Sequence, residues 1–262
     1  MLLTWLRNRR RRRIRAEPFP PEWLPYLENN VAHYRYLTAE EQARLRDDLR
    51  IFLAEKNWEG CGGLQMTDEI KVTVSAFACL LVLGMAHNYY DRVRSILVYP
   101  HGYRADEVGP DGVVHEGGSG RLGEAHYRGP VILSWDSIRH EGRHPREGHN
   151  VVFHEFAHQL DMLDGAVNGT PPLGSRAEYQ RWKEVMTREY TRLLDASGHH
   201  RATLLDQYGA TNEAEFFAVA TECFFDRPAE MAHRHPELYA LLRDYYRQDP
   251  ARRLADRHGR AG

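Results

Sequence analysis

The spacing of hydrophobic positions changes along the chain and separates expected helices from expected strands. Residues 37–58, "LTAEEQARLRDDLRIFLAEKNW", carry leucine and phenylalanine at helical spacing, and Thr38 and Glu41 before them form a capping-box sequence. We therefore predict an amphipathic helix over this segment. A second helix is expected to begin near Asp68 and to run to about Asn88, and because it is hydrophobic on nearly all sides it should lie in the core.

Two short β-rich runs follow, "RSILVYP" at 94–100 and "GPVILSW" at 129–135, and the glycine-rich segment between them is typical of turns or weak hairpins. "GPVILSW" could be an edge strand to which a peptide adds by backbone pairing, or a purely structural strand. Later helices are predicted over residues 176–195, 212–226 and 236–247. The pattern indicates an α+β fold that is mostly helical, with a small sheet inserted ahead of the 148–165 segment.

Charge divides the chain into a basic start and an acidic body. The formal net charge is −2, but seven arginines lie between Arg7 and Arg15, which leaves residues 16–262 with about −9. We expect residues 1–16 to be a flexible Arg-rich tail, and contact of this tail with nucleic acid or anionic lipid is the less favoured alternative. Residues 17–262 are expected to form one domain, with an N-terminal helical part over 17–90 and a second part over 91–262.

Nothing in the sequence predicts export or membrane insertion. The apolar start precedes the arginines, whereas a secretory signal has its positive charge first. The longest apolar run, at 74–86, is shorter than the roughly 20 residues that cross a bilayer. The chain has three cysteines and no CxxC pair, so neither a disulfide framework nor a thiolate zinc site is indicated. We expect a cytoplasmic protein.

The segment "GHNVVFHEFAHQLDMLDG", residues 148–165, carries candidate chemistry. On a helix His154 and His158 lie one turn apart on the same face, within reach of one metal ion, and imidazole suits zinc. Glu155 follows the first histidine and would lie near a metal-bound water. Asn150 is a plausible helix cap and Gly165 a plausible stop.

A third ligand should come from another helix, and residues 208–225 offer three glutamates. Glu215 and Glu222 are seven residues apart and share a helical face, whereas Glu213 points elsewhere. Glu215 is favoured as ligand, although it could instead complete a capping box with Asn212. Asp161 could hold a ligand imidazole in place by a hydrogen bond, or could be a solvated acid at the helix end.

At these residues the sequence resembles a known family. "HEFAHQLD" and "YGATNEAEFFAVATE" are similar to the Mlc titration factor A family of bacterial zinc peptidases, and both motifs are also similar to the anthrax lethal-factor metalloprotease domain. "ILVYP", "GPVILSW" and "YYRQDPARRL" also look like the Mlc titration factor A pattern, so that resemblance covers most of the chain. The Arg-rich start does not look like part of it.

The resemblance implies a zincin-like metallopeptidase domain that binds one Zn²⁺ per chain. It implies His154, His158 and Glu215 as zinc ligands, Glu155 as the general base and Tyr208 as a phenol that faces the site. It further implies residues 91–262 as the catalytic part, a peptide or protein substrate, aminopeptidase-like cleavage, and binding to a glucose-system transcription repressor of the Mlc type.

Two hypotheses remain open at this point. The first is a cytoplasmic zinc peptidase of the gluzincin type, HExxH plus glutamate. The second is a non-catalytic regulator that sequesters a transcription factor, with a structural or vestigial metal site. The remaining histidines, including His140, His144, His149, His199 and His200, are expected to be loop histidines rather than a second metal site, because none shows helical ligand spacing with an acid.

Overall fold

A computed structural model of the chain describes residues 2–102, 107–108, 114–115, 123–125 and 129–258. Its α-helices are α1 (Leu2–Ala16), α2 (Leu24–Asn30), α3 (Ala39–Glu55), α4 (Asp68–Leu81), α5 (Trp135–Arg143), α6 (Val151–Asp161), α7 (Arg176–Gly198), α8 (Glu213–Asp226), α9 (Pro228–Arg234), α10 (Pro236–Tyr246) and α11 (Pro250–His258). Short 3₁₀ turns join several of them, including η3 (Pro145–Glu147), η4 (Met162–Asp164) and η5 (Gln207–Ala210). The mostly helical α+β fold expected from the sequence is confirmed.

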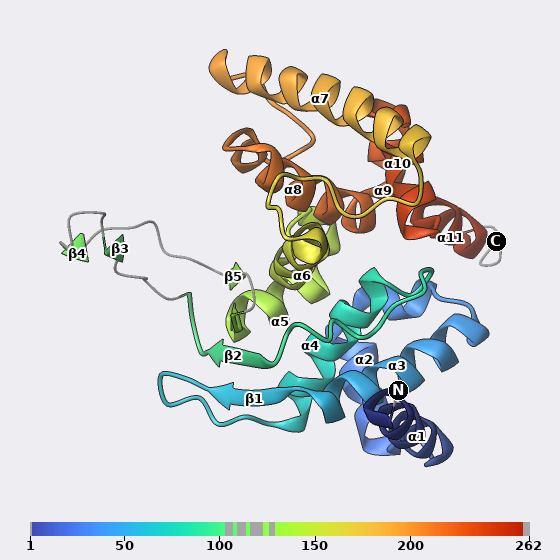
Figure 1. Ribbon diagram of the computed structural model, residues 1–262. Helices are drawn as coiled ribbons and strands as arrows, with labels where there is room; N and C mark the ends of the chain where they lie inside the picture. Colours follow the sequence, from blue (N-terminus) through green and yellow to red (C-terminus); the bar gives the residue numbers. More distant parts are fainter. Residues whose placement is uncertain (1, 103–106, 109–113, 116–122, 126–128, 259–262) are drawn as a thin grey trace.

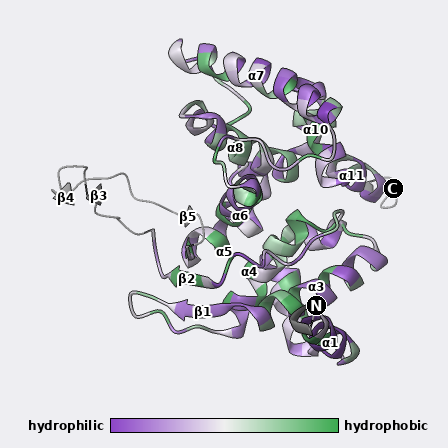
Figure 2. Ribbon diagram, in the orientation of Figure 1, coloured by the Kyte–Doolittle hydropathy of each residue, from purple (hydrophilic) through white to green (hydrophobic). Residues whose placement is uncertain are grey.

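The helices form two groups on either side of α6. In Figure 1, α1 to α4 lie on one side of α6, and α7 to α11 lie on the other. Helix α6 packs against α4 and against α8, so it lies between the two groups. Figure 2 shows hydrophobic residues gathered on α4 and hydrophilic residues along much of α7. None of the helices within the described residues combines the length and the hydrophobicity that a membrane span requires.

The sheet has four strands in the order β1 (Asn57–Gly60), β2 (Ser95–Tyr99), β6 (Val131–Ser134) and β5 (Gly123–Ala125). β1, β2 and β6 are parallel, and β5 pairs antiparallel with β6. β6 corresponds to "GPVILSW" and has neighbours on both sides, so the structure contradicts the edge-strand alternative and agrees with the structural-strand alternative. A peptide cannot add to β6, because β2 and β5 already occupy its backbone groups. Between β2 and β5, β3 (Glu107–Val108) and β4 (Val114–His115) pair antiparallel, as the expected weak hairpin would.

Helices α3 and α4 begin as the sequence predicts, but α4 ends earlier. Thr38 and Glu41 form a complete capping box at the start of α3. Helix α4 ends at Leu81 rather than near Asn88, and the chain turns at Gly84. A Cβ on Gly84 would lie 2.4 Å from the carbonyl oxygens of Tyr246 and Arg247. The end of α10 therefore packs closely against the turn that follows α4, a contact that the sequence pattern does not reveal.

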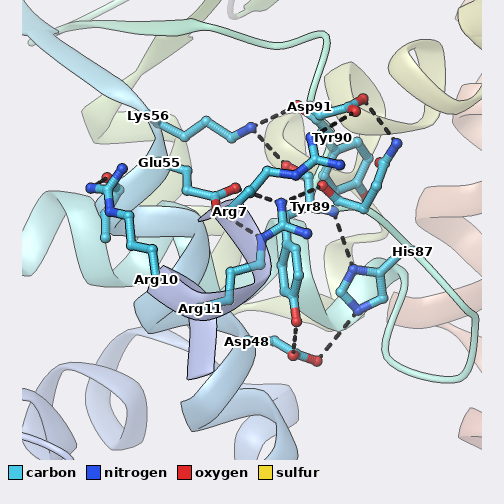
Figure 3. Close-up of polar contacts among 12 residues, drawn as sticks. Arg7, Arg10, Arg11, Asp48, Glu55, Lys56, His87, Tyr89, Tyr90 and Asp91 are labelled. Carbon is cyan, nitrogen blue, oxygen red and sulfur yellow. Dashed lines mark hydrogen bonds and ion pairs between the residues drawn. The ribbon is translucent and has the colours of Figure 1, made fainter. Parts of the chain in front are cut away.

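The N-terminal segment is helical and docked, which differs from the expected flexible tail over residues 1–16. Arg11 makes two hydrogen bonds of 2.7 and 2.6 Å to the Glu55 carboxylate, and both side chains are largely buried. Arg7 pairs with Asp91, and the side chain of Arg10 donates to the Ala54 carbonyl (Figure 3). Part of the arginine charge is therefore used within the fold, because partners from α3 and the 88–91 turn lie beside α1.

Candidate metal centre

The motif segment forms helix α6 with the expected cap. The Asn150 side chain accepts a hydrogen bond of 3.1 Å from the Phe153 backbone N–H. The Glu141 side chain of α5 accepts one of 2.7 Å from the Val151 N–H, so a second free donor of the first turn is satisfied. Gly165 follows η4 in the left-handed conformation, at φ 101°, and stops the helical path. The two ends of the motif helix are thus fixed by Asn150 and Gly165, which the sequence predicts, and by Glu141, which it does not.

Helix α8 brings Glu215 to the two motif histidines. Asn212 caps α8 by accepting a hydrogen bond from the Glu215 backbone N–H at 2.9 Å. The Glu215 carboxylate does not turn back to the cap, as a capping box requires, but lies 2.9 Å from His154 Nε2 and 3.4 Å from His158 Nε2. The two Nε2 atoms are 3.2 Å apart. The structure therefore brings together the three residues that the resemblance implies as ligands.

The separations of these three atoms fit a zinc ion. Zinc binds nitrogen and oxygen ligands at about 2.0–2.1 Å in a tetrahedron, whose ligand atoms are then about 3.3 Å apart. The observed separations of 2.9, 3.2 and 3.4 Å are close to one face of such a tetrahedron. His154, His158 and Glu215 could hold the ion and leave its fourth position for water or substrate.

Glu222 fixes the orientation of the His154 ring. Its Oε1 lies 2.7 Å from His154 Nδ1, and its Oε2 accepts a hydrogen bond of 2.6 Å from the Asn150 backbone N–H. With Nδ1–H donating to Glu222, the His154 ring would present an unprotonated Nε2 to a metal ion that takes the place of the Nε2 proton. Glu222 thus holds a ligand in place and is not itself among the three grouped ligand residues.

Asp161 has a different role from either one that the sequence suggested. It is fully buried, so it is not a solvated helix-end acid. Its two oxygens accept hydrogen bonds from the backbone N–H groups of Gly169 and Thr170, at 2.9 and 2.8 Å. Asp161 therefore anchors the loop that leaves the motif helix, and the imidazole-orienting role belongs to Glu222.

The electrostatics of the cluster favour a positive charge where the ligand atoms meet. Burial opposes protonation of His154, but the carboxylates of Glu222 and Glu215 outweigh it and raise the pKa of His154 well above its usual value. Burial alone would raise the pKa of the Glu215 carboxyl group. Its hydrogen bonds with His154 and His158 have the larger effect and lower this pKa to about 2. A metal ion could supply this charge in place of a proton.

Glu155 and Tyr208 lie beside the same cluster. Glu155 is 4% exposed and adjoins His154 in α6. Tyr208 belongs to η5, the turn before α8, and its ring centroid is 6.0 Å from that of His154. The Tyr208 side chain is 56% exposed, so it lies at the open side of the site. Glu213 is exposed at the start of α8, as its position on the helix predicts.

The role of Glu222 leads to a quantitative prediction. Glu222→Ala is expected to weaken metal binding about 10–100-fold, because His154 loses the group that fixes its tautomer and orientation. Glu213→Ala is the matched control, since Glu213 is an exposed glutamate on the same helix. Zinc affinity measured in competition with a chromophoric chelator checks this. Equal affinity of the two variants would refute the orienting role.

Comparisons with known proteins identify the relatives of this chain. The family model described as "Glucose-regulated metallo-peptidase M90" matches residues 5–247. The chain is 42% identical over 249 residues to the uncharacterized Synechocystis sp. protein slr2042. The aligned residues cover 94% of this chain and 90% of that protein. It is 33% identical over 223 residues to the Mlc titration factor A of Salmonella arizonae, covering 83% and 88% of the two chains.

The family match also includes most of the Arg-rich segment, because it begins at residue 5. The expectation that this segment falls outside the family pattern is therefore wrong. Helix α1 packs on α3, so it is part of the folded domain. The match over nearly the whole length, with two motif histidines and a glutamate gathered at one point, shows that the chain belongs to the glucose-regulated metallo-peptidase M90 family.

Proposed function

We propose that the protein is a zinc-dependent peptidase that hydrolyses peptide bonds at the site formed by α6 and α8. The observation that carries the proposal is the meeting of His154, His158 and Glu215 at separations that suit zinc, with Glu155 beside them. A metal held by two histidines and one glutamate keeps an open position, as catalytic zinc sites do. When bound, zinc would supply Lewis acidity that polarises the scissile carbonyl and lowers the pKa of water toward ~7.

The protein's own side chains would manage the proton and the developing negative charge. Glu155 is buried next to His154, so its carboxylate can take a proton from the attacking water and pass it to the leaving amine. Tyr208 stands at the open side of the site, where its hydroxyl could donate a hydrogen bond to the substrate carbonyl oxygen as that oxygen becomes negative. Glu222 would keep the His154 ring oriented throughout.

We further propose that the enzyme is cytoplasmic and cleaves short peptides in the manner of an aminopeptidase. The support for this proposal is the family resemblance of the two active-site motifs.

The experiment that tests zinc dependence removes the metal with a chelator and then adds zinc back. Cleavage of a chromogenic aminoacyl substrate and of a mixed peptide library is expected to fall to background after metal removal and to return with about one equivalent of zinc. Cleavage that is unchanged in fully metal-free protein would refute the zinc-dependent mechanism.

A second candidate function is favoured by the name of several relatives, Mlc titration factor A. It is a regulator that binds a transcription repressor of the Mlc type, with or without catalysis. The acidic body of the chain would suit a basic DNA-binding partner. Capture of a purified Mlc-type repressor by both the wild type and Glu215→Ala would support binding that is independent of the metal. Failure of both to capture it would eliminate this candidate.

A further inference from the structure

A second group of metal-binding side chains lies on the surface, just before the motif helix. His140 is in the last turn of α5, His144 caps that helix at its C-terminal end, and Glu147 is in η3. One potential ligand atom from each lies within 4.8 Å of the other two. Among the described residues, only this group and the motif group bring three such side chains together. The expectation that these are ordinary loop histidines rested on the absence of ligand spacing with an acid, and the structure contradicts that premise.

The hydrogen bonds of this group leave one ligand atom free and pair two others with each other. His144 Nδ1 lies 2.8 Å from the His140 carbonyl oxygen, which can only accept, so Nδ1 carries the proton and Nε2 of the neutral ring is a free ligand atom. His140 Nε2 lies 2.9 Å from Glu147 Oε2 and donates a hydrogen bond to this carboxylate, so the two groups already face each other and a metal ion would displace the Nε2 proton. The two histidine rings are 4.6 Å apart between centroids.

Part of the positive charge around the group is engaged elsewhere. Arg143, which precedes His144, directs its guanidinium to the Asn30 side-chain oxygen, with hydrogen bonds of 3.2 and 2.7 Å. His144 and Glu147 also line a pocket of about 1070 Å³, so water and ions can reach them. The three side chains are exposed, and little desolvation opposes binding.

We propose that His140, His144 and Glu147 form a second, weaker zinc site, distinct from the motif site. Two imidazoles and one carboxylate are the donor set that suits zinc, and one ligand atom from each of the three side chains already lies within 4.8 Å of the others. The ion would join the end of α5 to η3. Because Glu141 of α5 also holds the Val151 N–H, this brace would act on the segment that leads into the motif helix.

Zinc stoichiometry tests the proposal. Protein purified without added metal would be titrated with ZnCl₂ by calorimetry and by equilibrium dialysis with mass-spectrometric metal analysis. The test variant is His140→Ala with His144→Ala. The control is His199→Ala with His200→Ala, an exposed pair in which His199 Nδ1 likewise lies 2.7 Å from a backbone carbonyl but which forms no three-ligand group. Circular dichroism checks that both variants fold.

The expected result is a second zinc equivalent in the wild type, retained in the control and lost in the test variant, while the tighter equivalent persists in all three. Absence of a second equivalent in the wild type would overturn the proposal. Equal uptake by the test variant and the control would overturn it too, because the zinc would then bind elsewhere. The single substitution Glu147→Gln is expected to weaken zinc binding at the second site at least tenfold without changing zinc binding at the first.

Discussion

Glu155→Gln is expected to lower kcat for peptide hydrolysis by about 10²–10⁴-fold or more, while the protein keeps its metal. Glutamine has nearly the same shape as glutamate but cannot take a proton from water or return it to a leaving amine. Because glutamine keeps the size of the buried Glu155 side chain, and because Glu155 is not one of the three grouped ligand residues, the fold and the ligand set should be unchanged. The measurement is kcat and KM for a peptide substrate together with metal content.

Glu213→Gln is the matched control for this variant, because it makes the same chemical change at an exposed position on α8. It should leave kcat close to the wild-type value. If Glu155→Gln cleaves as fast as the control while holding the same amount of metal, Glu155 is not the general base.

Gly169→Ala is expected to destabilise the fold by about 2–5 kcal/mol and to reduce metal binding. Gly169 adopts φ +70°, and a Cβ there would lie 2.2 Å from the Glu213 carbonyl oxygen. Its N–H donates to Asp161, and its carbonyl accepts a hydrogen bond from the Trp182 indole, so the loop cannot easily move away. The first turn of α8, which carries Glu215, would have to shift instead.

Urea unfolding measures the loss of stability, and a metal assay measures the loss of metal binding. The control Gly63→Ala separates the backbone strain of a positive φ from the collision of the added Cβ with its neighbours. Gly63 also has a positive φ, +81°, but a Cβ there meets nothing within 4 Å. That substitution should cost only about 1–2 kcal/mol, the price of the left-handed conformation for alanine. Equal destabilisation by the two variants would show that the contact with the start of α8 is unimportant.

The motif helix and its partner were predictable because their signals are local. Asn150, the histidines four residues apart and Gly165 all lie within one segment, and the cap at Asn212 lies next to the helix it starts. Helical periodicity also placed Glu215 and Glu222 on one face. It could not tell which glutamate meets Nε2 and which meets Nδ1 of His154, because that depends on how α8 crosses α6.

The errors concern contacts between segments that the local sequence pattern does not reveal. The arginines of α1 looked like a solvated tail because their partner Glu55 lies 44 residues from Arg11. β6 looked like an edge strand because β5 comes from a segment with little strand signal. Asp161 looked like a partner for an imidazole on its own helix face. Its carboxylate instead accepts hydrogen bonds from backbone N–H groups of the loop that follows.

Metal content of the purified protein, compared between wild type and Glu215→Ala, tests the central claim most directly. The account predicts about one tightly bound zinc per chain in wild type purified without added metal. It predicts a clear loss in Glu215→Ala, because only His154 and His158 would remain as ligands. Wild-type protein that binds no zinc even when zinc is supplied, or a Glu215→Ala variant that retains it fully, would contradict the account.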